Sequence, residues 1–378
     1  MQRREFLGKS LLVAAGGTLL ARIDAAESKP ASHPAGEVSA PVSARVKLGM
    51  RLPPRLNEKA LTHLRQSNLG WCRLDLNPED ATEDFLRETV DRYAKGGVKV
   101  AAATCRFERA EQDAFLPEAF SRRISREQHF IRLLGQLGVA NYEIAFNRHT
   151  PNSQVYSTGT RTRRGIEVRH FDLAELRKTE GKPVHTYPAD QVTRAFDSYM
   201  NQLLPVAEQA GVRIALHPDD PPIAEIGGVA RIFHHIEHYK AAFKRHPSPN
   251  LGVLFCVGTW AEGGDAMGAG ISEAIEYFHA QKRLFSIHFR NVSAPLPVFE
   301  ETFMDDGYVD LQAVMNTLVR IGYDGLLVPD HIPFFDLEAD QSVVTAAGRY
   351  ETPFRAAGIA YSAGAMNVYL QNALRVSK

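Results

Sequence analysis

Short apolar segments alternate with longer segments of helical periodicity from about residue 46 to the end of the chain. Eight apolar segments are predicted strands: Val46–Gly49, Trp71–Leu76, Val98–Ala103, Tyr142–Phe146, Val212–Leu216, Leu251–Phe255, Leu284–Phe289 and Gly325–Val328. Several of them are apolar throughout, which is typical of strands that are buried on both faces of a parallel sheet. The alternation therefore indicates an α/β fold in which helices cover a parallel sheet.

The segments between these strands have the periodicity of amphipathic helices. The predicted helices include Glu83–Lys95, Arg126–Leu137, Ala189–Ala210, Val229–Arg245, Ile271–Gln281 and Leu311–Ile321. A glycine of the kind that ends helices stands before the next strand at Gly97, Gly138, Gly211 and Gly322. Eight strand–helix units predict a (β/α)8 TIM-like barrel over residues 46–378, and a doubly wound open sheet is the alternative.

A long polar segment, Asn147 to His185, interrupts the alternation after the fourth strand. It is rich in arginine and contains no clean helical pattern before Ala189. In a barrel this segment is an insertion on the catalytic face. A solvated surface loop is the alternative, because long loops in compact domains are either functional or mobile.

The first 45 residues differ in composition from the rest of the chain. Arg3 and Arg4 precede an apolar stretch from Leu11 to Leu20, and Ala25-Ala26 follows as a cleavage region. This order predicts a twin-arginine signal peptide over residues 1–26 and a periplasmic mature protein, with an uncleaved tail or anchor as the alternative. Residues 27–45 are rich in Ser, Pro and Ala and predict a disordered linker.

Composition excludes several classes of partner. Lys+Arg and Asp+Glu each number 44, so the chain has no electrostatic footprint for nucleic acid. No later run approaches the roughly 18 apolar residues of a membrane span. The three cysteines are Cys72, Cys105 and Cys256, whose odd number and wide spacing do not form a disulfide framework. A small-molecule substrate is therefore the expected partner, and a homo-oligomer stays open because no segment identifies an interface.

Four consecutive late strands end in residues that can bind a metal ion. They end at or near His217, Cys256, His288 and Asp330. Catalytic residues of a barrel lie at the carboxyl ends of different strands, where these four side chains converge. Imidazole, thiolate and carboxylate suit a borderline divalent ion such as Mn, Fe, Co or Zn. Singly, each has an ordinary alternative: a hydrogen-bonded histidine, a packed cysteine or a helix-capping aspartate.

Longer motifs surround these residues in a fixed order. They are Leu-His217-Pro-Asp-Asp-Pro-Pro, Gly227-Gly228-Val-Ala-Arg231-Ile-Phe, Phe-Cys256-Val-Gly-Thr, His288-Phe-Arg290-Asn291-Val, Glu301-Thr-Phe-Met-Asp305-Asp306-Gly307 and Pro-Asp330-His331. Together, from Gly211 to Phe354, they resemble the mannonate dehydratase family. The resemblance implies a xylose-isomerase-like TIM barrel and a lyase of glucuronate catabolism, which removes water from D-mannonate to give 2-keto-3-deoxy-D-gluconate.

The resemblance also implies roles for residues. Mn²⁺ or Fe²⁺ is held by the positions that match His217, Cys256, His288 and Asp330. The acid–base pair corresponds to His331 and to a tyrosine upstream of an Arg-x-x-Gly-x-x-Tyr motif, which points to Tyr350.

An anionic, polyhydroxylated substrate also needs polar contacts. Arg290, Asn291, Asp305 and Asp306 are the candidates for them. A turn at the two aspartates and an ion pair at Arg290 are the structural alternatives.

The early strands depart from the family pattern, in which a histidine-rich strand end contributes to the substrate pocket. Here the second strand carries Arg73 and Asp75, and the third is followed by Arg106. Two alternative functions follow. One is a related metal-dependent isomerase or epimerase acting on another sugar or sugar acid, and the other is an exported sugar- or metal-binding protein without catalysis.

Overall fold

The structure is a computed structural model that describes residues 46–107, 117–146, 155–162, 165–183, 185–332, 335 and 355–377. The predicted signal peptide and linker, residues 1–26 and 27–45, lie outside the described residues, as does Tyr350.

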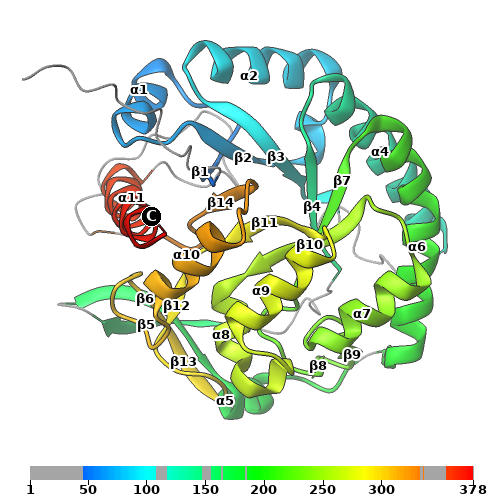
Figure 1. The fold of residues 1–378 in the computed structure, drawn as a ribbon. Coiled ribbons are helices and arrows are strands. Elements are labelled where there is room, and N and C mark those ends of the chain that lie inside the picture. Colours follow the sequence, from blue (N-terminus) through cyan, green and yellow to red (C-terminus); the bar gives the residue numbers. More distant parts are fainter. Residues whose placement is uncertain are drawn as a thin grey trace, which may run out of the picture. The chain divides into compact units, whose positions relative to one another are not determined.

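Eight parallel strands close into a barrel (Figure 1). They are β1 (Lys47–Leu52), β2 (Trp71–Leu76), β3 (Lys99–Cys105), β4 (Asn141–Ala145), β7 (Arg213–His217), β10 (Leu251–Cys256), β11 (Leu284–His288) and β14 (Leu326–Val328). The sheet closes where Lys47 of β1 pairs with Leu326 of β14. The predicted barrel is therefore confirmed, and the open-sheet alternative is wrong.

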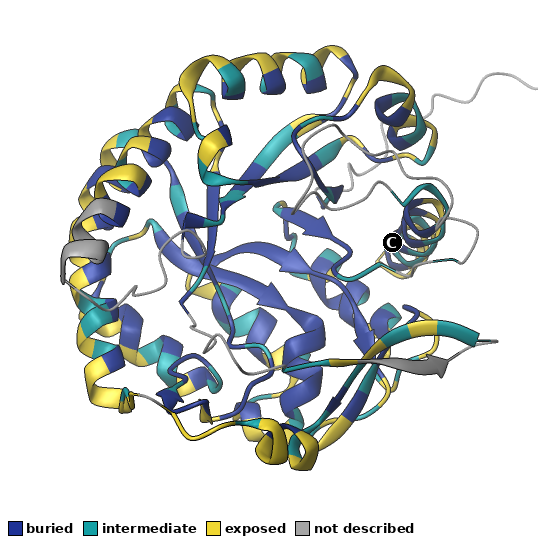
Figure 2. Ribbon diagram, turned by 180° about the vertical axis from the view of Figure 1, so that it is seen from behind, coloured by how far each residue is buried: buried dark blue, intermediate teal, exposed yellow. Residues whose placement is uncertain are grey.

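Helices surround the barrel, with buried inner faces and exposed outer faces (Figure 2). They are α1 (Glu58–Gln66), α2 (Glu83–Lys95), α4 (Pro117–Gln136), α5 (Leu173–Thr179), α6 (Ala189–Ala210), α7 (Ile236–Arg245), α8 (Val257–Gly263), α9 (Ile271–Ala280), α10 (Leu311–Arg320) and α11 (Ala356–Val376), with 3₁₀ turns at Pro78–Asp80 and Gly264–Met267. The four glycines predicted to follow helices all have positive φ, between 68° and 76°, as a left-handed helix end requires.

Two helices begin at residues other than those predicted. The helix expected from Val229 begins at Ile236, because a short antiparallel hairpin, β8 (Glu225–Ile226) with β9 (Val229–Ala230), precedes it. The helix expected from Arg126 begins earlier, at Pro117.

Side-chain alternation along the strands decides what faces the barrel interior. In β7, Ile214 and Leu216 join the core shared with the surrounding helices, whereas Ala215 packs with Leu254 and Phe285 in a small separate cluster. Successive side chains of a strand point to opposite faces, so residues two positions after an inward residue also point inward. This parity places the side chains at the ends of β7 and β10 in the barrel mouth.

The segment after the fourth strand is part of an appended sheet. It forms β5 (Ser157–Thr162) and β6 (Ile166–Asp172), which join β13 (Val298–Thr302) and β12 (Asn291–Val292) in a four-stranded sheet beside the barrel (Figure 1). Phe171 is fully buried and stacks on Phe299 at 5.2 Å between ring centroids. The insertion is thus confirmed, the solvated-loop alternative is wrong for its described part, and α5 is a helix that the sequence did not predict.

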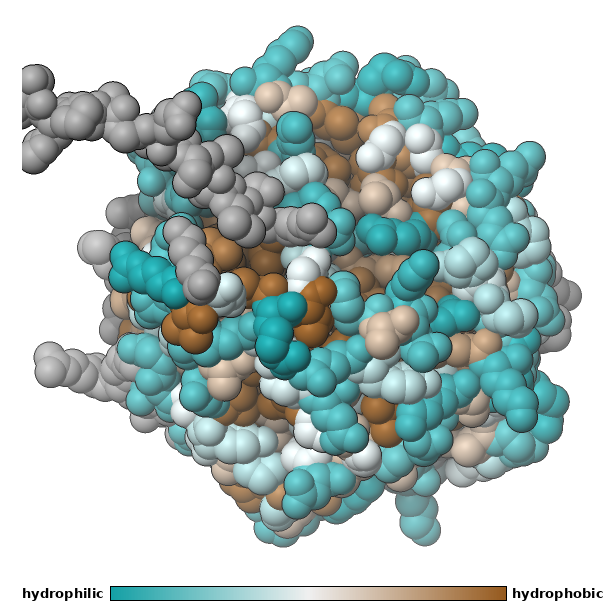
Figure 3. Space-filling model, viewed as in Figure 1, coloured by the Kyte–Doolittle hydropathy of each residue, from teal (hydrophilic) through white to brown (hydrophobic). Residues whose placement is uncertain are grey.

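Hydrophilic side chains cover most of the face shown in Figure 3, with hydrophobic ones in smaller areas between them. Among the described residues, no helix has the length and apolar character that a membrane crossing requires.

A candidate metal centre and active site

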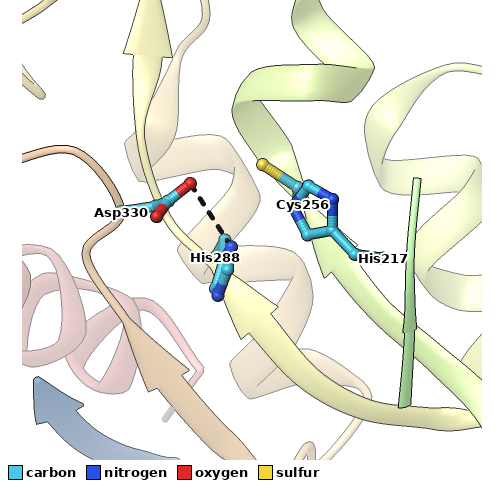
Figure 4. Close-up of side chains that lie close together, drawn as sticks. All are labelled: His217, Cys256, His288 and Asp330. Carbon is cyan, nitrogen blue, oxygen red and sulfur yellow. Dashed lines mark ion pairs between the residues drawn. The ribbon is translucent and has the colours of Figure 1, made fainter. Parts of the chain in front are cut away.

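The four predicted ligands converge at the carboxyl ends of four neighbouring strands. His217, Cys256 and His288 are the last residues of β7, β10 and β11, and Asp330 follows β14. One potential ligand atom from each lies within 4.8 Å of all the others (Figure 4). These strands are adjacent in the barrel, so the closure of the sheet brings together residues more than a hundred positions apart.

Burial favours the neutral form of both histidines. Burial lowers the pKa of His217, and it lowers the pKa of His288 to about 3. Nδ1 of His217 donates to the carbonyl of Pro218 at 2.7 Å, which leaves the Nε2 lone pair available to a cation. Nδ1 of His288 is buried, 3.3 Å from Oδ2 of Asp330, in an orientation that forms no hydrogen bond.

The two acidic ligands differ in their protonation. Burial raises the pKa of Cys256 to about 11, although its sulfur accepts a hydrogen bond from the backbone N–H of Thr259 at 3.4 Å. Burial also opposes ionisation of Asp330, but the nearby His288, His331 and Arg51 outweigh it and hold the pKa well below its usual range. Asp330 is therefore a carboxylate, whereas the Cys256 thiol needs a neighbouring cation to ionise.

These observations fit a divalent metal ion. Two neutral imidazoles, one carboxylate and one thiol form a compact donor set, and a buried imidazole nitrogen without a partner faces it. A mixed nitrogen, sulfur and oxygen set suits a borderline transition metal better than Mg²⁺ or Ca²⁺, which prefer oxygen alone.

His331 lies beside this centre, at the edge of a cavity of about 240 Å³ that it lines together with His217, His288 and Asp330. Nε2 of His331 is 3.6 Å from Oδ2 of Asp330. Its Nδ1 lies 2.5 Å from Oε1 of Glu301, a buried carboxylate on β13. The predicted acid–base residue is thus within reach of the metal centre, while its predicted partner, Tyr350, lies outside the described residues.

Arg290 is buried against the metal centre and is held by acidic groups. Its guanidinium lies 2.7 Å from Glu262, 3.0 Å from Asp220 and 3.4 Å from Asp330. The ion-pair alternative therefore describes Arg290: it balances the carboxylates behind the ligand Asp330. The OH group of Tyr156, from the insertion, donates to Asp220 as well.

The structure does not bring the other three predicted substrate contacts to the cavity. The side-chain amide of Asn291 donates to the carbonyls of Met304 and Val309 at 3.2 and 2.8 Å, so it holds the following loop. Asp305 and Asp306 are exposed in a turn, and the OH group of Tyr361 donates to Asp305. The turn alternative describes these two aspartates.

The early strands bring three arginines to the cavity; the sequence indicated Arg73 and Arg106 only as departures from the family pattern and did not single out Arg51. They are Arg51 of β1, Arg73 of β2 and Arg106, which directly follows β3. All three face Asp75, at 3.0, 2.7 and 3.9 Å respectively. Arg51 also donates to Asp330.

This network reaches the metal ligands as well. Arg73 donates to Nε2 of His288 at 2.9 Å. Burial raises the pKa of Asp75, but Arg73 and Arg51 outweigh it and lower the pKa overall, whereas burial raises the pKa of Glu143, which also lines the cavity. Three arginines therefore face two carboxylates of the early strands, Asp75 and Glu143, in this part of the cavity. Charged residues at alternate positions of an apolar strand, such as Arg73 and Asp75, were the available sequence signal.

The fold and the site together define a class. The chain is a TIM-barrel protein built around a candidate divalent-metal site at the carboxyl ends of its strands. The model of the D-mannonate dehydratase (UxuA) family matches residues 161–375, more than half of the chain, and the chain belongs to this family.

Curated relatives agree with this assignment. Mannonate dehydratases of Streptococcus equi subsp. zooepidemicus and Thermotoga petrophila are 32% and 33% identical over 182 and 139 residues, covering 48% and 35% of this chain and 48% and 37% of theirs. The chain thus spans about half the length of the curated relatives it matches, or less.

The mannonate dehydratase structure from Streptococcus suis covers 88% of this chain and 96% of its own, with a TM-score of 0.70 at 20% identity. A D-psicose 3-epimerase from Clostridium cellulolyticum has a TM-score of 0.55 at 12% identity, with 87% and 99% coverage. At these identities both structures support the fold alone.

Proposed function

We propose that the protein is a metal-dependent mannonate dehydratase, which removes water from D-mannonate to give 2-keto-3-deoxy-D-gluconate. Family membership supports this proposal, and one observation carries it: the four ligand candidates lie within 4.8 Å of one another, with His331 beside them. The reaction takes a proton from C2 and expels the C3 hydroxyl as water. The resulting enol becomes the 2-keto product.

The residues of this chain supply proton transfer and orientation. When bound, a divalent ion supplies Lewis-acid chemistry to the oxygens of a sugar acid. His331, whose Nε2 faces the metal centre, is placed to move a proton at C2 or at the C3 hydroxyl. Tyr350 is proposed for the other transfer on the resemblance alone.

We assign carboxylate recognition to the arginines at the early strand ends. Arg51, Arg73 and Arg106 line the same cavity as His331, and they outnumber the two carboxylates of the early strands that face them, Asp75 and Glu143. Guanidinium groups bind carboxylates with strong charge-assisted hydrogen bonds, which a neutral sugar cannot provide. An acid is therefore the favoured substrate class over a neutral sugar.

For the metal we propose Mn²⁺ or Fe²⁺, which the mixed donor set accommodates. Metal analysis of protein purified without oxygen tests this, followed by chelation and reloading with Mn²⁺, Fe²⁺ or Zn²⁺. Activity restored by Zn²⁺ and by neither of the other two would contradict the proposal.

The deciding experiment incubates purified protein with D-mannonate and Mn²⁺, with and without a chelator, and assays 2-keto-3-deoxy-D-gluconate. Product that disappears with the chelator supports the lyase. If stoichiometric metal is bound but no product forms, the lyase proposal fails. A screen of other sugar acids and sugars, which tests for an isomerase or epimerase, then takes its place. If neither product nor metal is found, the metal centre itself is refuted.

We also propose export to the periplasm by the twin-arginine route. The paired Arg3 and Arg4 before an apolar stretch support it. Cell fractionation of the wild type and of an Arg3→Lys, Arg4→Lys double variant tests it, and periplasmic accumulation of the double variant at the wild-type level would contradict it.

A further inference from the structure

The appended sheet reaches into the active site through a buried carboxylate. Glu301 lies on β13, and its side chain is directed at His331, which is 30 residues away in sequence and follows a barrel strand. Neighbouring Glu300 pairs instead with His170 of β6, at 3.8 Å. Because adjacent residues of a strand point to opposite faces, β13 presents one glutamate to the catalytic face and the other away from it.

The contact between Glu301 and His331 is short and shielded from water. Oε1 of Glu301 lies 2.5 Å from Nδ1 of His331, and only 7% of the residue surface of Glu301 is exposed. Burial opposes ionisation of Glu301, but His331, Arg290 and Arg169 outweigh it and lower its pKa. The acceptor is therefore a carboxylate, and hydrogen bonds to a charged acceptor are about twice as strong as neutral ones.

The contact at the other ring nitrogen of His331 shows which of the two nitrogens carries the proton. Arg169, on β6 of the insertion, donates from Nη1 to Nε2 of His331 at 3.2 Å. A nitrogen that accepts from a guanidinium carries no proton, so the proton of the neutral ring lies on Nδ1, toward Glu301. Nε2 is also the nitrogen 3.6 Å from Asp330, so the unprotonated nitrogen, which accepts from Arg169, lies beside the candidate metal centre.

The backbone of His331 gives a further reason for such a contact. Its φ is 49°, in the left-handed region that non-glycine residues rarely adopt. A residue in this conformation persists only when its surroundings hold it. The contacts to Glu301 and Arg169, both from the appended sheet, hold the ring from two sides.

We propose that Glu301 is a positioning residue for His331. It fixes the proton on Nδ1 and so presents the basic Nε2 to substrate at the metal centre. This inference rests on the proposed function, because it assigns His331 its direction of proton transfer: His331 takes the C2 proton, and the acid that protonates the leaving hydroxyl is a different group.

The kinetic test compares Glu301→Gln and Glu301→Ala with the matched control Glu300→Gln, on the same strand but directed elsewhere. We expect Glu301→Gln to lower kcat by about 10-fold to 100-fold, the usual loss when the partner of an active histidine is removed. KM should stay within about twofold, and Glu301→Ala should be at least as impaired. Glu300→Gln should remain within about twofold of wild type.

A merely structural role would change folding or metal content instead, so urea unfolding and metal stoichiometry are measured on each variant. Glu301→Gln is nearly isosteric and decides the matter if Glu301→Ala does not fold. Unchanged kcat in Glu301→Gln, or a loss that follows lost metal, would overturn the proposal.

A second measurement does not depend on turnover. In ¹⁵N-histidine-labelled protein loaded with diamagnetic Zn²⁺, the Nδ1 proton of His331 should give a far-downfield NMR signal, assigned by its absence in His331→Asn. It should persist in Glu300→Gln and move upfield or vanish in Glu301→Gln. An unchanged signal in Glu301→Gln refutes the contact. If the wild type is inactive on D-mannonate but gives the expected spectra, the proposed function is wrong and the contact between Glu301 and His331 stands. If the wild type is active and the Glu301 variants are unaffected, only this inference is wrong.

Discussion

The two halves of the barrel face the same cavity with different chemistry. The late half, β7, β10, β11 and β14, contributes two neutral imidazoles, a thiol and a carboxylate within 4.8 Å of one another. The early half, β1 to β4, contributes three arginines, the aspartate that they share and Glu143 of β4. The family model matches residues 161–375, which include the late strands and exclude the early ones.

The family pattern covers the late half better than the early half, and the physical demands on the two halves explain why. A metal site restricts donor type, distance and protonation, so few residues serve at each position. Attraction between a cation and a carboxylate falls off gradually with distance, so several arrangements of arginine meet the same need. Under the proposed function, the late half carries the metal chemistry, while the early half is where selectivity for a particular acid is free to differ.

The sharpest test of this division replaces one cysteine in each half. We expect Cys256→Ala to lose most bound metal and to lower kcat/KM by at least about 10³-fold, because Lewis-acid stabilisation contributes several kcal/mol. The control Cys72→Ala removes an equally buried thiol from β2 and should keep metal and activity within about threefold. Metal content and initial rates measure both. Equal metal loss in the two variants would break the division.

Substitutions in the early half should have their largest effect on the free energy of unfolding. Asp75→Asn leaves Arg51 and Arg73 without their shared buried carboxylate, so we expect a loss of about 3–5 kcal/mol in the free energy of unfolding. Glu83→Gln, which breaks an exposed pair with Arg87 on α2, should cost at most about 0.5 kcal/mol. Urea unfolding of both variants measures the difference, and similar losses would show that the arginine network is not a buried ionic core.

Substrate recognition should separate from catalysis at Arg106. We expect Arg106→Gln to raise KM for D-mannonate by about tenfold, the loss of one charge-assisted hydrogen bond, and to keep kcat within about threefold. Arg87→Gln removes an equal charge from the exposed face of α2 and serves as the control. A fall in kcat at unchanged KM would show that Arg106 acts in the chemical step, which would contradict the division between the two halves.

The smallest expected effect is on the stability of the protein at acidic pH. Burial, with His234 and His235 nearby, lowers the pKa of His238 to about 4. An unfolded histidine, with a pKa of about 6.5, binds the proton first, so stability present above pH 6.5 is lost progressively as pH falls toward 4. Asp75, whose pKa is also lowered, contributes stability that is lost only below about pH 4. Urea unfolding between pH 7.5 and 4 should therefore show a shallower loss in His238→Gln than in wild type. Identical slopes would exclude His238 as a source of the acid response.

Much of the scaffold could be predicted because its signals are local. Apolar runs located all eight barrel strands, and glycines before the returning strands marked helix ends that do have positive φ. Strand ends of a barrel meet at one mouth, so finding His217, Cys256 and His288 at strand ends was enough to predict that they converge. The appended sheet could not be predicted in this way. Its strands β6 and β13 lie more than 120 residues apart, and their pairing depends on the barrel that carries both.

The direction of individual side chains was the other feature that could not be predicted from the sequence. Asn291 and Asp305 stand in motifs next to the ligands, yet the fold turns them to a loop and to the surface.

The sequence by itself determined the barrel, its candidate metal ligands and the presence of His331, because periodicity and strand ends are properties of short segments. The tertiary structure alone decided that Arg51, Arg73 and Arg106 line the cavity beside these ligands and that Glu301 faces His331. Such contacts depend on which elements pack together, and non-local packing is fixed by the whole core rather than by any one segment.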